Sequence, residues 1–346
     1  MKIAFLACNR KPELFRSDPS YIYRCENLGL ELSRLGHEVE FRHSSESLQG
    51  KQFDLVVFHR PKNTWRIWLL AKYFRLSGTK VLADFDDLIF DLNFAEFSPG
   101  FVNGLNILKK TKKTYLSHQQ ALSFFDGFTV STEPLKAHLQ SLFPNKAITV
   151  IPNAVHHQWL AEGIDFKAEP VDFARPVLSY LPGTRSHDQD FKLIATGLSQ
   201  FLKLHPQVRL DITGPLSFQL GAELASQVSH HEKVAFATFH QRFQSTWVNL
   251  APLEDTPFNR CKSALKVLEA AYWGKPTLCS PIPDVLRYRN AGAVLIETPD
   301  DICNKLTKLL EPNYYKEFVQ NLRKEALKLS DIRQFAASFI SLADSN

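Results

Sequence analysis

Short apolar runs that are rich in β-branched and aromatic residues alternate with longer helical patterns along most of the chain. The expected strands are 2–8, 38–42, 54–59, 80–85, 127–131 and 148–152, then 176–183, 208–214, 234–239, 247–253, 276–281 and 293–297. The expected helices between them are 22–35, 65–77, 104–125, 133–142, 188–204, 258–273, 299–311 and 314–329. This alternation is typical of parallel sheets built from βαβ units. It predicts an α/β protein with two Rossmann-like halves.

A chain of 346 residues is also long enough for about two domains. We expect one Rossmann-like domain over residues 1–155 and a second over 170–330, with the boundary near 155–175. A last helix in 331–346 is expected to pack back on the first domain. Two facing domains of this kind bind ligands in the crevice at the carboxyl ends of their strands.

Composition excludes several classes of protein. With 44% apolar and 22% charged residues the profile is that of a soluble globular protein, and no apolar run is long enough for a spanning helix. The start, KIAFLAC, predicts a first strand rather than a signal peptide. Five cysteines without a CxxC pair indicate reduced thiols in the cytoplasm and argue against a structural zinc site. A net charge of +5 is too small to predict a nucleic-acid partner.

Basic and aromatic side chains are interleaved in 59–80, and 109–113 reads KKTKK. Such a combination suits contact with an anionic membrane surface. The alternative is an ordinary helix whose aromatic side chains are buried and whose cations are solvated. A position at the inner face of the cytoplasmic membrane therefore stays one of two interpretations.

The segment 253–278 is the most informative part of the sequence. On one helix starting near Phe258, Lys262, Lys266 and Glu269 share a face. A helix N-terminus favours phosphate, and Glu269 can accept hydrogen bonds from ribose hydroxyls. Alternatively, the lysines are solvated and Glu269 pairs with one of them. The residues expected to hold nucleotide phosphates here are Arg260, Lys262, Ser263 and Lys266.

A second group of polar residues follows the first strand of the second half, in 180–191. Gly183 allows close backbone approach to a ligand, and Arg185 can hold a phosphate through two hydrogen bonds. His187 is expected beside them. Asp188 and Asp190 are candidate carboxylates that stabilise or attack the anomeric carbon of a sugar. Either aspartate could instead cap the following helix.

A third group lies at the end of a predicted strand, in 83–91, and consists of Asp84, Asp86, Asp87 and Asp91. The end of a parallel strand points into the crevice, so Asp86 and Asp87 are candidates for binding or deprotonating an acceptor. Two alternatives stay open. The D-x-D pattern also holds divalent metals through donor phosphates, and aspartates at such positions also cap helices. The interpretation adopted has no metal ligand and no cofactor.

Several of these segments resemble family-4 retaining glycosyltransferases. LEAA followed by GKPT in 268–277 is similar to the donor-binding segment of that family, IPNAV at 151–155 to its inter-domain turn, and STEPLKAHL at 131–139 to the preceding helix. Two features depart from the family pattern. Cys261 stands where the first of two paired glutamates is expected, with Glu254 further upstream, and 9–23 replaces a glycine-rich loop.

The resemblance implies a GT-B fold and a nucleotide-sugar donor as co-substrate. It further implies retention of configuration and transfer to a glycan or lipid-linked glycan acceptor, such as a growing lipopolysaccharide or capsule chain. Three alternatives share the architecture. They are a transferase for a CMP-activated ulosonic acid such as 3-deoxy-manno-octulosonic acid, a non-catalytic glycan-binding scaffold and a sugar-nucleotide epimerase.

Overall fold

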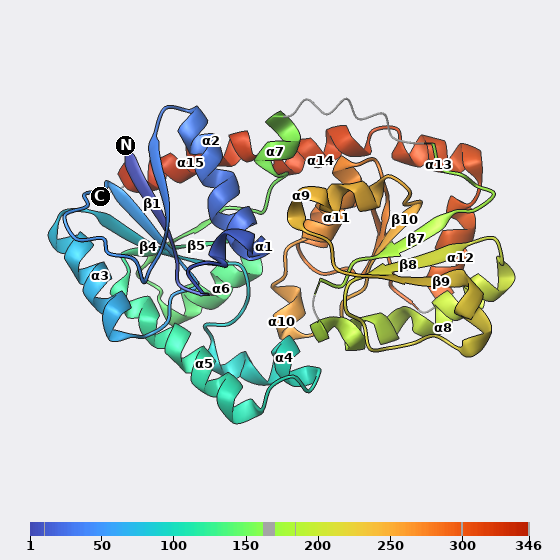
Figure 1. The fold of residues 1–346 in the computed structure, drawn as a ribbon, viewed down its shortest axis with the longest axis horizontal. Helices are drawn as coiled ribbons and strands as arrows, with labels where there is room; N and C mark the ends of the chain where they lie inside the picture. Colours follow the sequence, from blue (N-terminus) through green and yellow to red (C-terminus); the bar gives the residue numbers. More distant parts are fainter. Residues whose placement is uncertain (10, 162–169, 184, 299, 345–346) are drawn as a thin grey trace.

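The computed structural model describes residues 1–9, 11–161, 170–183, 185–298 and 300–344. Two sheets of six parallel strands lie side by side, each with helices packed around it (Figure 1). The two α/β halves predicted from the alternating sequence pattern are therefore confirmed. Part of the boundary expected near 155–175, and residues 345–346 of the expected last helix, lie outside the described residues.

The N-terminal half has the strand order β2-β1-β3-β4-β5-β6. Its strands are β1 (Lys2–Ala7), β2 (Glu38–His43), β3 (Leu55–His59), β4 (Lys80–Phe85), β5 (Gly127–Val130) and β6 (Ala147–Val150). Its helices are α1 (Pro19–Tyr21), α2 (Asn27–Arg34), α3 (Trp65–Leu76), α4 (Pro99–Val102), α5 (Leu108–Ala121) and α6 (Glu133–Leu142), with α7 (His157–Ala161) after the sheet. The central strands are buried on both faces, which explains their continuous apolar runs.

The C-terminal half has the order β12-β11-β10-β7-β8-β9. Its strands are β7 (Val177–Tyr180), β8 (Arg209–Thr213), β9 (Val228–His231), β10 (Val248–Ala251), β11 (Thr277–Cys279) and β12 (Ala293–Leu295). Its helices are α8 (Asp188–Leu204), α9 (Phe236–Phe239), α10 (Pro257–Arg260), α11 (Leu265–Tyr272), α12 (Asp300–Leu309), α13 (Pro312–Val319) and α14 (Leu322–Ser330), followed by α15 (Ile332–Asp344). The helix predicted over 314–329 is divided in two, because Asn321 leaves the helical conformation at φ −118° and ψ 6°.

Three of the described helices begin at a capping threonine. The hydroxyls of Thr64, Thr132 and Thr256 accept hydrogen bonds from backbone amides in the first turns of α3, α6 and α10. Such caps satisfy amides that have no partner inside the helix. They fix the points at which the chain turns from the sheet edge into each helix.

The strand predicted at 234–239 is wrong. Residues 236–239 form the short helix α9, and the sixth strand is β9, which pairs with β8. β9 reads VSHH and lies at the sheet edge with mostly exposed or half-exposed side chains, so it needs few apolar residues. The apolar residues of α9 serve a different contact, because the Phe236 ring stacks on Trp159 with ring centroids 6.1 Å apart.

The last helix, α15, crosses back to the N-terminal half and packs against α2 (Figure 1). Ile332, Ala336 and Phe339 belong to the same buried cluster as strand β1, and the Phe339 ring stacks on Phe5 with centroids 5.8 Å apart. The two crossing segments also touch, since the Val155 amide donates to the Ser330 carbonyl at 2.8 Å. The halves are thus joined by two adjacent passages of the chain.

Candidate active site

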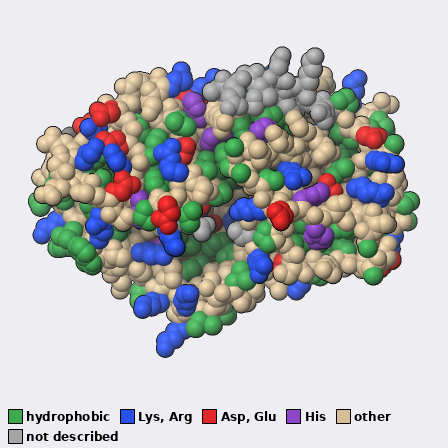
Figure 2. Space-filling view, in the orientation of Figure 1, with side chains coloured by type: hydrophobic (Ala, Val, Ile, Leu, Met, Phe, Trp, Pro, Cys, Tyr) green, Lys and Arg blue, Asp and Glu red, His purple; other side chains and the backbone are tan. Residues whose placement is uncertain are grey.

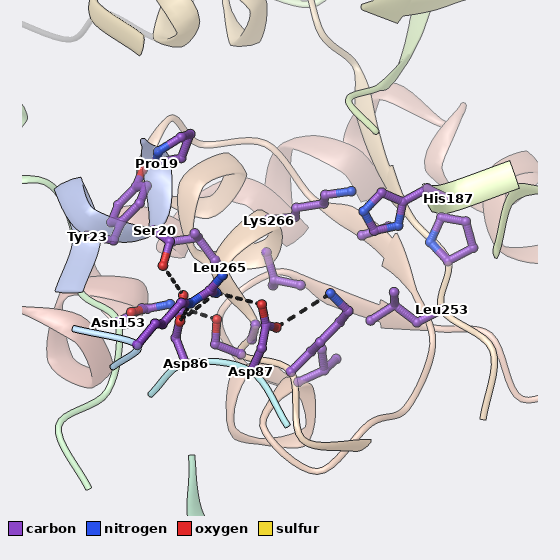
Figure 3. A pocket seen from close by; sticks show the side chains of 18 residues that line it. Pro19, Ser20, Tyr23, Asp86, Asp87, Asn153, His187, Leu253, Leu265 and Lys266 are labelled. Atoms are coloured by element: carbon purple, nitrogen blue, oxygen red, sulfur yellow. Dashed lines mark hydrogen bonds and ion pairs between the residues drawn. The ribbon is translucent and has the colours of Figure 1, made fainter. Parts of the chain in front are cut away.

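A cavity of about 300 Å³ lies between the halves, at the carboxyl ends of strands from both sheets (Figure 3). The N-terminal half lines it with Pro19, Ser20, Tyr23, Arg60, Asp86, Asp87 and Asn153. The C-terminal half lines it with His187, Ala251, Pro252, Leu253, Lys262, Ser263, Ala264, Leu265, Lys266, Val267 and Val285. The acidic side chains come from one half and the lysines from the other.

The lysines stand at a break in the chain rather than along one helix. Helix α10 ends at Arg260 and α11 begins at Leu265, so the single helix expected from Phe258 is wrong, and Lys262 lies in the turn between them. Tertiary hydrogen bonds hold this turn. Thr132 donates to the Cys261 carbonyl at 2.8 Å, and Asp284 accepts from the Ala264 amide at 2.7 Å.

Lys266, in the first turn of α11, faces the cavity beside His187 (Figure 3). Burial disfavours its charged form and lowers its pKa to about 8, while Asp190 and Glu269 oppose that effect. Its ammonium lies 5.6 Å from the Tyr180 ring centroid. Lys266 is thus a half-buried cation at the cavity wall.

Glu269 lies one turn further along α11 and is buried. Burial raises its pKa to about 7, although the Tyr23 hydroxyl, which donates to it at 2.5 Å, and the nearby Lys266 lower it. Tyr23 comes from the first helix of the N-terminal half. This hydrogen bond therefore crosses the crevice and ties the two halves together beside the cavity.

Asp190 holds the His187 ring in place. Its Nδ1 lies 2.8 Å from Asp190, and burial together with Lys266 lowers its pKa to about 4, so the ring is neutral at physiological pH. Asp190 is buried and also accepts hydrogen bonds from the Glu254 amide at 2.8 Å and from Asn259 at 3.2 Å. These contacts make Asp190 a residue that orients His187 and the loop before α10.

On the opposite wall, Arg60 follows β3 and holds two carboxylates. It donates to Asp86 and to Asp87, each at 2.6 Å. Among the described non-glycine residues only Arg60 has a positive φ, 51°. Such a conformation persists where surrounding contacts enforce it, often at functional sites. Lys262 reaches toward the same wall and lies 3.9 Å from Asp87.

The first helix of the chain supplies the remaining polar groups. It begins at Asp18, whose carboxylate accepts from the Ser20 amide at 3.3 Å, and a π-helical turn over Ile22–Glu26 joins α1 to α2. Turns of this type are frequent at functional sites. Arg24, within it, is buried and forms an ion pair with Asp84 at 2.7 Å.

Asp84 lies behind the cavity at the end of β4. Burial alone would raise its pKa, but the Arg24 guanidinium and the hydrogen bond from His59 hold it below its usual range. Thr129 also donates to it, at 2.8 Å. Asp84 is thus an ionised, fully bonded group that organises its neighbours.

Neither a protein-family model nor a curated protein sequence matches this chain. Solved structures do resemble it. Sucrose-phosphate synthase from Thermosynechococcus elongatus superposes with a TM-score of 0.67 at 14% identity over 99% of this chain and 98% of that one. WaaG, a glycosyltransferase involved in lipopolysaccharide biosynthesis, gives a TM-score of 0.62 at 13% identity over 99% and 100%. Anabaena HepE, solved with UDP-glucose, gives 0.59 at 13% identity over 99% of both chains.

The chain has the GT-B fold. Its neighbours span both halves, so the likeness covers the whole two-sheet arrangement and not one Rossmann-like unit. In this GT-B arrangement the cavity lies where the carboxyl ends of two parallel sheets face each other, the position that open α/β sheets use for ligands.

The GT-B crevice brings together about half of the residues predicted as site residues. Those that line the cavity are Asp86, Asp87, His187, Lys262, Ser263 and Lys266, with Glu269 directly behind it. The others lie elsewhere. Arg185 and Arg260 are exposed, and Arg260 pairs with Asp255 at 2.5 Å. Asp188 accepts from the Ser217 amide at 3.0 Å, and Gly183 turns the chain after β7 with φ +75°.

Four polar residues of the cavity were absent from the sequence prediction: Ser20, Tyr23, Arg60 and Asn153. Asp18 followed by Pro19 is a helix-start signal that places Ser20 and Tyr23 at the sheet edge. Asn153 lies in the IPNAV segment, where it donates to Ser263 at 2.8 Å. Nothing in the local sequence marks Arg60, because its partners are 26 and 27 residues away.

We expect Asp84→Asn to lower the free energy of unfolding by about 3–5 kcal/mol, because it leaves the Arg24 charge buried without its counterion. Urea denaturation measures this. Asp255→Asn is the matched control, since it breaks an Asp–Arg pair whose side chains are mostly exposed, and it should change stability little. Equal losses in the two variants would contradict the importance assigned to the buried pair.

Proposed function

We propose that this protein is a glycosyltransferase that binds a nucleotide sugar in the cavity between its halves. The observation that carries the proposal is the separation of charge across this one cavity. Lys262 and Lys266 form a cationic wall on the C-terminal half, and Asp86 and Asp87 form an anionic wall on the other. The lysines suit the phosphates of a donor, and the carboxylates suit the hydroxyl groups of an acceptor.

The chemistry follows from these walls. When the bond between the sugar and the nucleotide breaks, negative charge develops on the leaving phosphate, and preorganised cations stabilise that charge most effectively in a water-poor cavity. Glu269, predicted to bind the ribose, is buried behind the cavity and accepts a hydrogen bond from Tyr23, so this scheme assigns it no contact with the donor. Asp86 or Asp87 receives the proton of the attacking hydroxyl. Asp190 acts by orienting His187, and Asp188 has no part in this scheme.

The acceptor in this proposal is a bacterial surface glycan, in line with the lipopolysaccharide role stated for the neighbour WaaG. HepE, which has the same fold, was solved with UDP-glucose, and this supports a nucleotide-sugar donor. Retention of configuration is carried over from the resemblance of 268–277 to retaining enzymes. Proton NMR of the anomeric centre in donor and product tests it.

Lys266→Met should weaken binding of the cognate nucleoside diphosphate by about 1.5–3 kcal/mol, the value of a hydrogen bond to a charged group. A thermal-shift screen with UDP, GDP, CMP and ADP identifies the nucleotide, and calorimetry then compares the proteins. Lys316→Met, on exposed α13, is the control and should bind like the wild type.

The pH dependence of nucleotide affinity is a second test of Lys266. Since the pKa of Lys266 is about 8, the cation is present below that value and is lost above it. Nucleotide affinity should therefore fall about tenfold from pH 7 to pH 9, and Lys266→Met should abolish this dependence. Unchanged affinity in Lys266→Met for every nucleotide would remove the phosphate site from the proposal.

We also expect transfer without a metal, because Lys262 and Lys266 can supply the positive charge that a divalent ion provides elsewhere. Full activity in EDTA is the expected outcome. A loss of activity that manganese or magnesium restores would instead favour a metal held near Asp84 and Asp86.

Two further assays distinguish the alternative functions. Hydrolysis of the donor in the absence of acceptor distinguishes an enzyme from a binding scaffold, and interconversion of the free sugar nucleotide identifies an epimerase.

A surface of the N-terminal half supports contact with an anionic membrane at the cytoplasmic face. Trp65 and Leu76 on α3 are 73% and 79% exposed, and Ile107 just before α5 is 68% exposed. Lys109, Lys110, Lys112 and Lys113 follow in α5 and are exposed as well. Hydrophobic and basic side chains gather along the lower left edge of the molecule (Figure 2). Among the described residues no helix is long and apolar enough to cross a bilayer.

Replacing Lys110 and Lys113 with Gln should weaken binding to vesicles of phosphatidylglycerol and phosphatidylcholine by about 2 kcal/mol. Ile107→Ala should weaken it too. Leu204→Ala is the matched control, because Leu204 is also 68% exposed but lies on α8 of the other half. Cosedimentation measures the bound fraction, and equal binding by all variants would rule this surface out.

A further inference from the structure

Four side chains form a continuous hydrogen-bonded chain from behind the cavity to its wall. His59 Nδ1 lies 2.9 Å from Asp84 Oδ2, His59 Nε2 lies 2.9 Å from Ser20 Oγ, and Ser20 Oγ donates to Asp86 Oδ2 at 2.6 Å. His59 is completely buried, whereas Ser20 and Asp86 line the cavity (Figure 3). The chain connects the cavity with a group that no ligand can touch.

The number of protons in this chain is constrained by its donors and acceptors. Ionised carboxylates only accept, and the Ser20 hydroxyl has one proton. To fill all three hydrogen bonds, either the His59 ring carries two protons or Asp86 carries one. The two forms contain the same number of protons and differ by a shift of two protons through Ser20. The chain therefore has room for one proton beyond its resting complement.

The charges around the chain favour an extra proton. The carboxylates of Asp18, Asp84, Asp86 and Asp87 outnumber the cations of Arg24, Arg60 and Lys262 by one, which leaves one negative charge for a protonated His59 to offset. Burial on its own would raise the pKa of Asp86, but Arg60, His59 and the Ser20 hydrogen bond hold it well below its usual range. The titratable or charged groups that face the chain from surrounding elements are Asp18, Tyr21, Arg24, Cys25, Arg60, Asp87, His118 and Lys262.

The backbone fixes the position of Asp86 relative to this chain. The Arg60 amide donates to the Asp84 carbonyl at 2.9 Å, and the Arg60 side chain donates to Asp86. Arg60 is the residue whose backbone has the positive φ of 51°. Asp84, in turn, is fixed by Arg24 and Thr129. Both ends of the chain are thus held independently of Ser20 and His59.

Asp84, His59 and Ser20 are arranged in the order of a hydrolase triad, in which the serine is a nucleophile. The position of Asp86 argues against that role. The hydroxyl donates to a carboxylate 2.6 Å away instead of to the histidine, and that carboxylate would repel the oxyanion of a tetrahedral intermediate formed by attack of Ser20. The hydroxyl is better suited to passing protons between His59 and Asp86.

We propose that Ser20 and His59 form a relay that removes the acceptor's proton from Asp86. As the acceptor oxygen forms its bond to the anomeric carbon, the electrons of the sugar–phosphate bond leave with the nucleotide, and the hydroxyl proton moves to Asp86. Asp86 passes this proton to Ser20, which gives its own to His59 Nε2. Asp84 stabilises the resulting imidazolium, and the proton returns to solvent after product release. The relay rests on the proposed transferase function.

The first experiment needs no turnover. Nitrogen-15 NMR of histidine-labelled protein counts the protons on the His59 ring as the pH is varied, with His59→Asn to assign the signal. The ring should hold two protons at low pH and one at high pH, and Ser20→Ala should move the midpoint of that change. A ring that holds a single proton wherever the protein is folded would overturn the relay.

The second experiment measures transfer. Ser20→Ala should lower kcat by about 100-fold, within the range of general acid–base catalysis, and leave donor affinity unchanged. Ser20→Thr, which keeps a hydroxyl, should restore most of the rate. In the wild type, the rise of kcat with pH should share its midpoint with the loss of the second ring proton. Ser131→Ala is the matched control, because Ser131 donates only to the Asp86 backbone carbonyl, at 3.4 Å.

The outcomes separate the relay from the function on which it rests. Wild-type kcat in Ser20→Ala, or covalent labelling of Ser20 by a fluorophosphonate, would overturn the relay and leave the transferase proposal intact. If the wild type transfers sugar from none of the nucleotide donors, the transferase proposal fails. The NMR titration then still decides whether the Asp84–His59–Ser20–Asp86 chain takes up the extra proton.

Discussion

The buried ion pair between Arg24 and Asp84 joins the three segments on which the cavity is built. Arg24 comes from the first helix, Asp84 from the end of β4, and the same guanidinium donates to Ile151 and Asn153 in the passage between the halves. Because a buried charge without its partner is costly, the three segments have to meet in one arrangement. Asn153 then extends the connection to Ser263 in the other half.

The two walls of the cavity differ in how their charges are balanced. On the N-terminal side two carboxylates share the single cation of Arg60, so this wall keeps an excess of negative charge. On the other side two lysines face the cavity, and burial together with the neighbouring Lys262 lowers the pKa of Lys266 to about 8. An anionic ligand therefore gains most by binding to the C-terminal wall, and a neutral hydroxyl is better matched to the N-terminal one.

The sequence predicted what depends on local periodicity and missed what depends on distant contacts. Parallel strands and helices such as Glu133–Leu142 were predictable, because each is encoded by its own apolar pattern and cap. The break between α10 and α11 was not, since Thr132 and Asp284, which hold it, lie far away in the chain. The predicted lysines and aspartates that line the cavity follow strands or begin helices, which local patterns mark. Ser20, His59 and Arg60 are brought to the cavity by partners that are distant in the sequence.

The path of α15 has a consequence for how the chain is made. The N-terminal half leaves the ribosome before the C-terminal half, yet Phe339 and Ala336 complete its buried cluster around Phe5. Until the last few turns of helix emerge, this half exposes an apolar strip that the finished protein covers. Domains generally fold as units in order of synthesis, but here the first half to be synthesised is also the last to be finished.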